Sequence, residues 1–181
     1  NPPTVSEVSE SKPAPASGCL ICGDPLVYGT VGEHRRCAIC GEIAPTRARC
    51  RQGHFVCDAC HVEGPLEFTR RLCIDSRDTD VFPLFYRICA HPTVPLHGPE
   101  YHAIVPGVLL AVYRNLGGTI DDDRIVEGIN RGALVPGGSC AFLGTCGAAV
   151  GVGIAFAVIL ESTPLKAKPR SIVQDIVAET L

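Results

Sequence analysis

Seven cysteines and His54 lie within 42 residues near the N-terminus, at spacings that suit metal binding. They form four successive pairs: Cys19 with Cys22, Cys37 with Cys40, Cys50 with His54, and Cys57 with Cys60. A Cys-x-x-Cys pair lets two thiolates reach one ion from a tight turn, and Gly23 and Gly41 permit the left-handed backbone that such a turn needs. Zinc binds four nitrogen or sulfur donors in a tetrahedron. Eight donors therefore predict two closed, structural zinc sites.

The order of the pairs leaves two ways to share the ligands. In a zinc ribbon, the first two pairs would hold one ion, and the remaining cysteines would hold the other with His54 or His61. The spacing from Cys37 onward also resembles the first part of a RING-type cross-brace, in which alternate pairs share an ion. That resemblance implies one site of Cys19, Cys22, Cys50 and His54, and a second of Cys37, Cys40, Cys57 and Cys60. An extra leading pair and a missing trailing pair depart from the RING pattern, so ubiquitin-ligase activity is not implied.

The pattern of cysteines also indicates which metal is bound and in which compartment the protein lies. Adjacent Cys-x-x-Cys thiols favour metal or redox chemistry over a disulfide framework. A histidine among the donors favours zinc, with an iron–sulfur cluster as the alternative. Residues 1–17 show no apolar core of a signal peptide, so we expect a reducing cytoplasm.

A second group of residues able to do chemistry lies in the C-terminal two-thirds of the chain. His97, Glu100 and His102 fall within six residues of one another. Two imidazoles and a carboxylate can hold a metal ion, which would be a third ion, or can transfer protons. A glutamate near a helix N-terminus is also explained by the helix dipole alone.

Two cysteines in glycine-rich segments complete this group. Within one unbroken helix, Cys140 and Cys146 would not share a face. A break at Gly144 would instead make Thr145 a helix cap and place Cys146 in the first turn, where the helix dipole favours a thiolate. We therefore predict Cys146 as a nucleophile or ligand and Cys140 as its partner. In this hypothesis His97 and His102 act as acid/base groups or ligands, and Glu100 orients them.

Two resemblances involve these motifs. The Cys146-Gly-Ala-x-x-Gly segment resembles part of a small redox-associated family named for its Cys-Gly-Cys-Ala-Gly-Cys-Cys pattern. The cysteine pairs, the His97-Gly-Pro-Glu-Tyr-His102 segment, Pro136-Gly-Gly-Ser-Cys and Gly144-Thr-Cys-Gly-Ala together resemble an uncharacterised domain family of anaerobic bacteria and archaea. Members of that family are found with methyltransferase-like proteins, and the resemblance implies no established activity.

Changes in composition along the chain predict its domains. Residues 1–17 are rich in Pro, Ser and Ala and read as a disordered linker. Residues 18–62 form the zinc-binding module, of ribbon or cross-brace type, and residues 63–181 form a mainly α-helical domain. Proline, aspartate and glycine signals predict helices over about 66–74, from 78 or 79 to 90, 99–115, 122–131 and 171–181. Pro106 argues for a kink or a late start in the third of these helices.

The stretch from Ala133 to Leu160 contains no charged residue. Its glycines and Pro136 argue against a membrane span, and its strongly apolar part is too short to cross a bilayer. We expect instead a buried, glycine-rich helix at the centre of the domain.

Charge limits the partners. The formal net charge of −3 provides no basic field for nucleic acid or an anionic membrane. The sequence thus favours a metal-binding protein with a Cys/His site for thiol redox, sulfur-transfer or metal-handling chemistry on a small molecule. Alternatives are a non-catalytic module that docks a protein partner, such as a methyltransferase, and an iron–sulfur protein.

Overall fold

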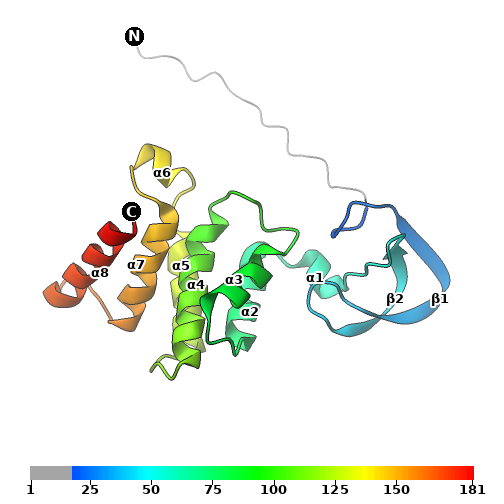
Figure 1. Cartoon of the computed structure of the whole chain (residues 1–181), viewed down its shortest axis with the longest axis horizontal. Helices are drawn as coiled ribbons and strands as arrows, with labels where there is room; N and C mark the ends of the chain where they lie inside the picture. Colours follow the sequence, from blue (N-terminus) through cyan, green and yellow to red (C-terminus); the bar gives the residue numbers. More distant parts are fainter. Residues whose placement is uncertain (1–17) are drawn as a thin grey trace, which may run out of the picture. The chain divides into compact units, whose positions relative to one another are not determined.

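The computed structural model describes residues 18–181, apart from the side chain of Val62, and divides the chain into two compact units. The first unit ends at His61 and the second begins at Val62. Figure 1 labels the strands and helices of both units. The interpretation of residues 1–17 as a disordered linker lies outside the described residues.

The first unit is a β-hairpin followed by one short helix. Strand β1 (Leu26–Arg36) pairs antiparallel with β2 (Ile43–Cys50), and α1 (Asp58–Val62) follows. The register shifts between Tyr28 and Glu33, which marks an irregular bulge in β1. The cysteine pairs flank this hairpin: one precedes β1, one lies in the connection between the strands, and Cys50 ends β2.

The apolar core of this unit is small. Its buried members are Cys37, Phe55 and Cys60, and two of the three are cysteines. A lone two-stranded hairpin is only marginally stable in water, and units of this size need a staple such as a metal ion. The first unit therefore depends on its sulfur atoms more than on apolar burial.

The second unit is entirely helical in its regular structure. Three of its helix starts follow local signals: Pro65 opens α2, the Asp80 side chain accepts a hydrogen bond from the Phe82 N–H, and the Asp121 side chain accepts one from the Arg124 N–H. The helices are α2 (Pro65–Asp75), α3 (Val81–Cys89), α4 (Glu100–Asn115), α5 (Asp122–Ala133), α6 (Ser139–Phe142), α7 (Gly147–Ile159) and α8 (Ala167–Thr180).

The centre of this unit is α4, which packs against α2, α3, α5 and α7. The sequence led us to expect the glycine-rich helix, α7, at the centre, but α4 holds that position. Helix α7 contacts α4, α5 and α8, but its Phe156 stays 36 % exposed. Helix α4 is longer than α7, at 16 residues against 13, and eight of its residues are buried against six in α7.

Helix α4 begins at Glu100 and runs through Pro106, so the late start that this proline suggested does not occur. Proline has no N–H, and the carbonyl of His102 four residues earlier therefore lacks its usual helical partner. Gly132 of α5 and Gly151 of α7 both lie against this carbonyl. A Cβ atom added to Gly132 would come 2.2 Å from the oxygen, and one added to Gly151 would come 3.1 Å from it. The two glycines thus let α5 and α7 approach α4 closely.

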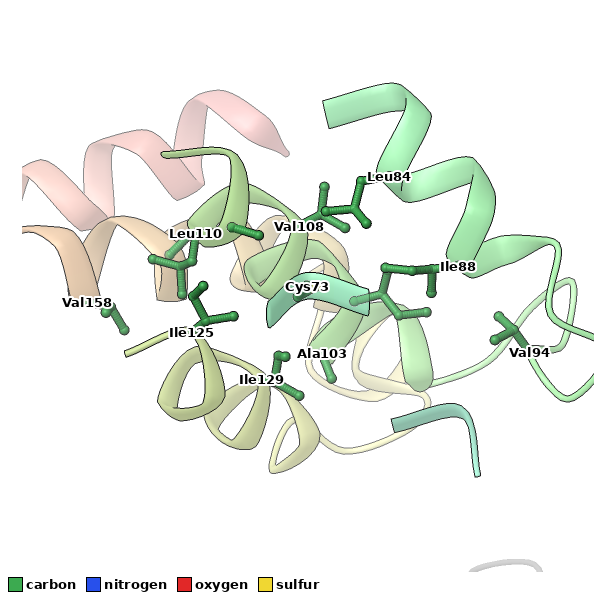
Figure 2. Close-up of a cluster of buried hydrophobic side chains, with 13 residues drawn as sticks. Cys73, Leu84, Ile88, Val94, Ala103, Val108, Leu110, Ile125, Ile129 and Val158 are labelled. Carbon is green, nitrogen blue, oxygen red and sulfur yellow. The ribbon is translucent and has the colours of Figure 1, made fainter. Parts of the chain in front are cut away.

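Figure 2 shows the core between these helices, with Cys73, Leu84, Ile88, Leu110 and Ile129 directed toward one another. Cys73 is fully buried, and burial raises the pKa of its thiol to about 12. It serves as a small apolar side chain of the core.

One buried histidine of this unit was not singled out by its sequence. His91 is 2 % exposed, and its ring packs on Phe68 with 4.0 Å between ring centroids. Its Nδ1 accepts a hydrogen bond from the backbone N–H of Thr93, which places the ring proton on Nε2. Burial lowers the pKa of His91, so the ring is held neutral near pH 7.

The uncharged stretch does not form a membrane-length element. Within residues 18–181, no helix has both the length and the apolar character needed to span a bilayer.

The contact at Gly132 gives a test of this packing. We expect Gly132→Ala to destabilise the helical unit by about 1–3 kcal/mol, because the new methyl group would meet the backbone of His102 and Ala103, which cannot rotate away. This cost should exceed the roughly 1 kcal/mol that alanine gains over glycine within a helix. Urea denaturation followed by circular dichroism would measure it. Gly137→Ala is the matched control, since its Cβ would find only ordinary contacts at 3.8 Å; equal stability of the two variants would contradict the packing.

Candidate metal centres

Three turns of the first unit share one design. In the first, the Gly23 N–H donates to the Cys19 carbonyl at 2.8 Å; in the second, the Gly41 N–H donates to the Cys37 carbonyl at 3.0 Å. Both glycines have left-handed backbone, with φ of 76° and 78°. Each turn also directs a backbone N–H at its first sulfur: Ile21 N lies 3.4 Å from Cys19 Sγ, and Ile39 N lies 3.4 Å from Cys37 Sγ.

The third turn joins Cys50 to His54 and uses Gly53, whose φ is 89°. The Gly53 N–H donates to the Cys50 carbonyl, and the His54 N–H approaches Cys50 Sγ at 3.3 Å. Each turn thus presents a donor pair while its backbone N–H groups stabilise negative charge on sulfur.

The turns bring eight donors into two groups of four. Site 1 consists of Cys19, Cys22, Cys50 and His54, and site 2 consists of Cys37, Cys40, Cys57 and Cys60; within each site all donor atoms lie within 4.8 Å of one another. Either group could hold a metal ion. This is the interleaved arrangement, and the sequential ribbon arrangement does not occur because the first and second pairs belong to different sites. His61 is in neither group.

The distances between donors fit a tetrahedral ion. Cys22 Sγ lies 3.8 Å from Cys50 Sγ in site 1, and Cys40 Sγ lies 3.8 Å from Cys57 Sγ in site 2. Zn–S bonds of about 2.3 Å give tetrahedral S–S edges of about 3.8 Å. The 3.5 Å between Cys50 Sγ and His54 Nδ1 likewise suits a mixed sulfur–nitrogen edge. No disulfide occurs among the eleven cysteines, all of which lie in the described part of the chain.

The electrostatics of site 2 call for a cation. Burial raises the pKa of the Cys37 thiol, but backbone N–H groups of Cys57, Cys40 and Ile39 outweigh this effect and lower it to about 6. The pKa of Cys60 is instead strongly raised, by burial and by the neighbouring sulfurs of Cys57 and Cys40. One thiol of the group ionises readily and another resists, because thiolates this close repel each other. A divalent ion removes that conflict.

In the helical unit, the structure brings His102 close to the chain next to Cys146. A Cβ added to Gly147 would lie 2.2 Å from His102 Nε2, so the ring occupies space that only glycine leaves free. The Nδ1 of His102 lies 3.1 Å from the carbonyl oxygen of Val135, which fixes the ring proton on Nδ1 and leaves a lone pair on Nε2. Cys146 itself takes the N-cap position of α7, one residue later than the expected cap at Thr145.

The other predicted members of this group have different surroundings. His97 and Cys140 are exposed. Glu100 turns its carboxyl group back over Gly98, and its Oε2 is buried without a hydrogen-bond partner among the described residues. The Val135 carbonyl, rather than Glu100, orients His102. No third group of three metal donors within 4.8 Å occurs in residues 18–181.

A family model for DUF5714, a family of unknown function, matches residues 69–181. The chain belongs to this family. The match begins within α2 and covers almost all of the helical unit, and it leaves out all eight donors of sites 1 and 2. The DUF5714 segment contains His102, Cys140 and Cys146 but carries no assigned activity. No curated protein and no solved structure matches the chain.

The two histidines at the end of the first unit allow a test of the site 1 ligands. We expect His54→Ala to weaken metal binding at site 1 by roughly tenfold or more, because it leaves three donors for a tetrahedral ion. His61→Ala should bind metal as the unchanged protein does, since His61 belongs to neither site. Competition with a chromogenic chelator would measure both affinities. Equal loss in the two variants, or loss in His61→Ala alone, would contradict the ligand set.

Proposed function

We propose that the first unit is a cross-brace module that binds two zinc ions, each in a structural role. The observation that carries this proposal is the 3.8 Å separation of sulfurs at both sites, which equals the edge expected around tetrahedral zinc. Cysteines bound to different irons of a cluster would lie farther apart. All four tetrahedral positions are filled by protein donors, so neither ion keeps an open position for a substrate.

Metal content tests the proposal directly. We expect protein purified under reducing conditions to contain two zinc ions per chain and no iron, as measured by elemental analysis against protein concentration. Binding should follow from the folded arrangement of the thiolates, so zinc added to metal-free protein should restore the same ratio. A stable preparation with one metal per chain, or with iron in place of zinc, would contradict the proposal.

A second function has support in the helical unit. We infer a thiol site at Cys146, with His102 as the group that takes up the thiol proton. Cys146 is exposed at the N-cap of the 13-residue helix α7. The unprotonated Nε2 of His102 lies against Gly147, the next residue in the chain. Thiol redox or sulfur-transfer chemistry would use such a pair, with Cys140 as the second thiol.

Cys140 and Cys146 are both exposed, so their reaction rates can be compared within one protein to test this inference. We expect Cys146 to react with iodoacetamide faster than Cys140, and we expect His102→Gln to slow the reaction of Cys146 by about tenfold. Cys140 is the matched control within the same protein, and its rate should not change. Peptide mass spectrometry over a time course would give both rates. Equal slowing of both cysteines would indicate a loss of structure instead of a specific role for His102.

The hairpin also supports a protein partner. Tyr28, Val31 and Ile43 are 73 %, 79 % and 63 % exposed on this small unit. A partner that covered these side chains would remove apolar surface from water, which favours association. In this proposal the zinc module docks another protein while the helical unit carries the thiol site.

A further inference from the structure

The two metal sites differ in how far their cysteines are exposed to solvent. In site 2, Cys37 and Cys60 are 2 % and 1 % exposed, and the other two cysteines are partly buried. In site 1, Cys19 and Cys50 are 7 % and 0 % exposed, but Cys22 is exposed. Cys22 is the one exposed residue among the donors of both sites, which all lie in the described part of the chain.

The side chains around the two sites also give site 2 more apolar cover than site 1. Phe55 is buried with Cys37 and Cys60, and Ile39, Ala44 and Val56 pack against this cluster. Within residues 18–181, neither of the two buried apolar clusters contains a donor of site 1. Apolar cover excludes water and dissolved reagents, so site 2 is protected where site 1 is not.

We propose that site 1 is a redox-sensitive zinc site, which hydroperoxides empty through Cys22 while site 2 keeps its ion. This inference rests on the proposed zinc-binding function. The Cys22 thiolate attacks one oxygen of the hydroperoxide, the O–O bond breaks, and Cys22 becomes a sulfenic acid as hydroxide or alkoxide leaves. Cys50, 3.8 Å away, then attacks the Cys22 sulfur, forms a disulfide and releases hydroxide. Two thiolates thus supply the two electrons that reduce the peroxide.

Loss of these two thiolates would release the ion. Only Cys19 and His54 would remain at site 1, and two donors do not make a closed zinc site. The turn of residues 18–24, which site 1 anchors, would be freed. The hairpin connection would stay tied to α1 through site 2, because that site joins Cys37 and Cys40 to Cys57 and Cys60. A thiol reductant and zinc would reverse the change.

Formal charge alone would favour oxidation of site 2 before site 1. Four thiolates around Zn²⁺ give site 2 a charge of −2, whereas three thiolates and a neutral imidazole give site 1 a charge of −1. More negative sulfurs are better nucleophiles, but an oxidant must first reach them. In site 2, Cys37 Sγ is buried and faces two backbone N–H groups, from Ile39 and Cys57, each at 3.4 Å. Backbone N–H groups also face Cys19 and Cys50 in site 1, so they do not distinguish the two sites, and access of the oxidant decides the order.

The test uses the zinc-loaded full chain carrying Cys140→Ser and Cys146→Ser, which removes two exposed thiols that would compete for oxidant. Hydrogen peroxide is added, and released zinc is followed by a chromogenic chelator. We expect one equivalent of zinc to be released about tenfold or more faster than the second. Peptide mapping at the end of the fast phase should find a disulfide between Cys22 and Cys50.

Two matched variants complete the test. Cys22→His retains four donors at site 1 but removes the exposed sulfur, so the fast phase should disappear. Cys40→His makes the same change at site 2 and should leave the fast phase unaltered. Loss of both ions together, first oxidation at site 2, or a fast phase that survives in Cys22→His would overturn the inference alone. Fewer than two zinc ions before peroxide is added would instead contradict the proposed function, and this inference with it.

Discussion

Convergence of thiolates on a common point is the constraint on which the first unit depends. Apolar burial cannot replace it, because the buried cluster of this unit contains only one large apolar side chain, Phe55, beside Cys37 and Cys60. The hairpin instead delivers donors from its two ends and its connection, and the three glycine-containing turns aim backbone N–H groups at sulfur. Thiolates held this close repel one another, and a cation bound between them would remove that repulsion. Because each site takes its donors from alternate pairs, the two sites link segments of the first unit that would otherwise have few contacts.

The helical unit is built by a different rule, in which close approach of helices matters most. Pro106 leaves the His102 carbonyl without a helical partner, and glycines of α5 and α7 lie against that carbonyl. The same residue carries the imidazole that packs on Gly147 at the start of α7. His102 therefore links the packing of the unit to the proposed thiol site through two parts of one residue.

Local signals predicted much of the fold, because helix ends are decided by a few neighbouring residues. Pro65, Pro99 and the Asp121 segment mark helix starts that the structure places within about one residue of expectation. Helix α4, and not the glycine-rich helix, lies at the centre because of contacts between distant segments. The spacing of apolar residues along the sequence does not contain that information. Likewise, Cys146 lies at the cap because the chain turns at Gly144, whose φ is 67°.

For the sites, the donor types and spacing indicated metal binding, but the grouping of pairs depended on how the hairpin returns. The sequence left ribbon and cross-brace arrangements open, and only the cross-brace order matches the observed groups. The Val135 carbonyl that orients His102 is 33 residues away in the chain and is a backbone group, so no side-chain motif could have indicated it. The buried His91 had no signal either, because the ring that packs on it, Phe68, comes from a separate segment of the chain.

The central claim is that metal–thiolate bonds, and not apolar burial, hold the first unit together. Amide hydrogen exchange measured residue by residue, before and after zinc is removed by a chelator in the presence of a reductant, tests it most directly. The account predicts that amides of residues 18–61 lose their protection while those of α4 and α5 keep theirs. Full protection of the hairpin in protein shown to be free of metal and of disulfides would contradict it.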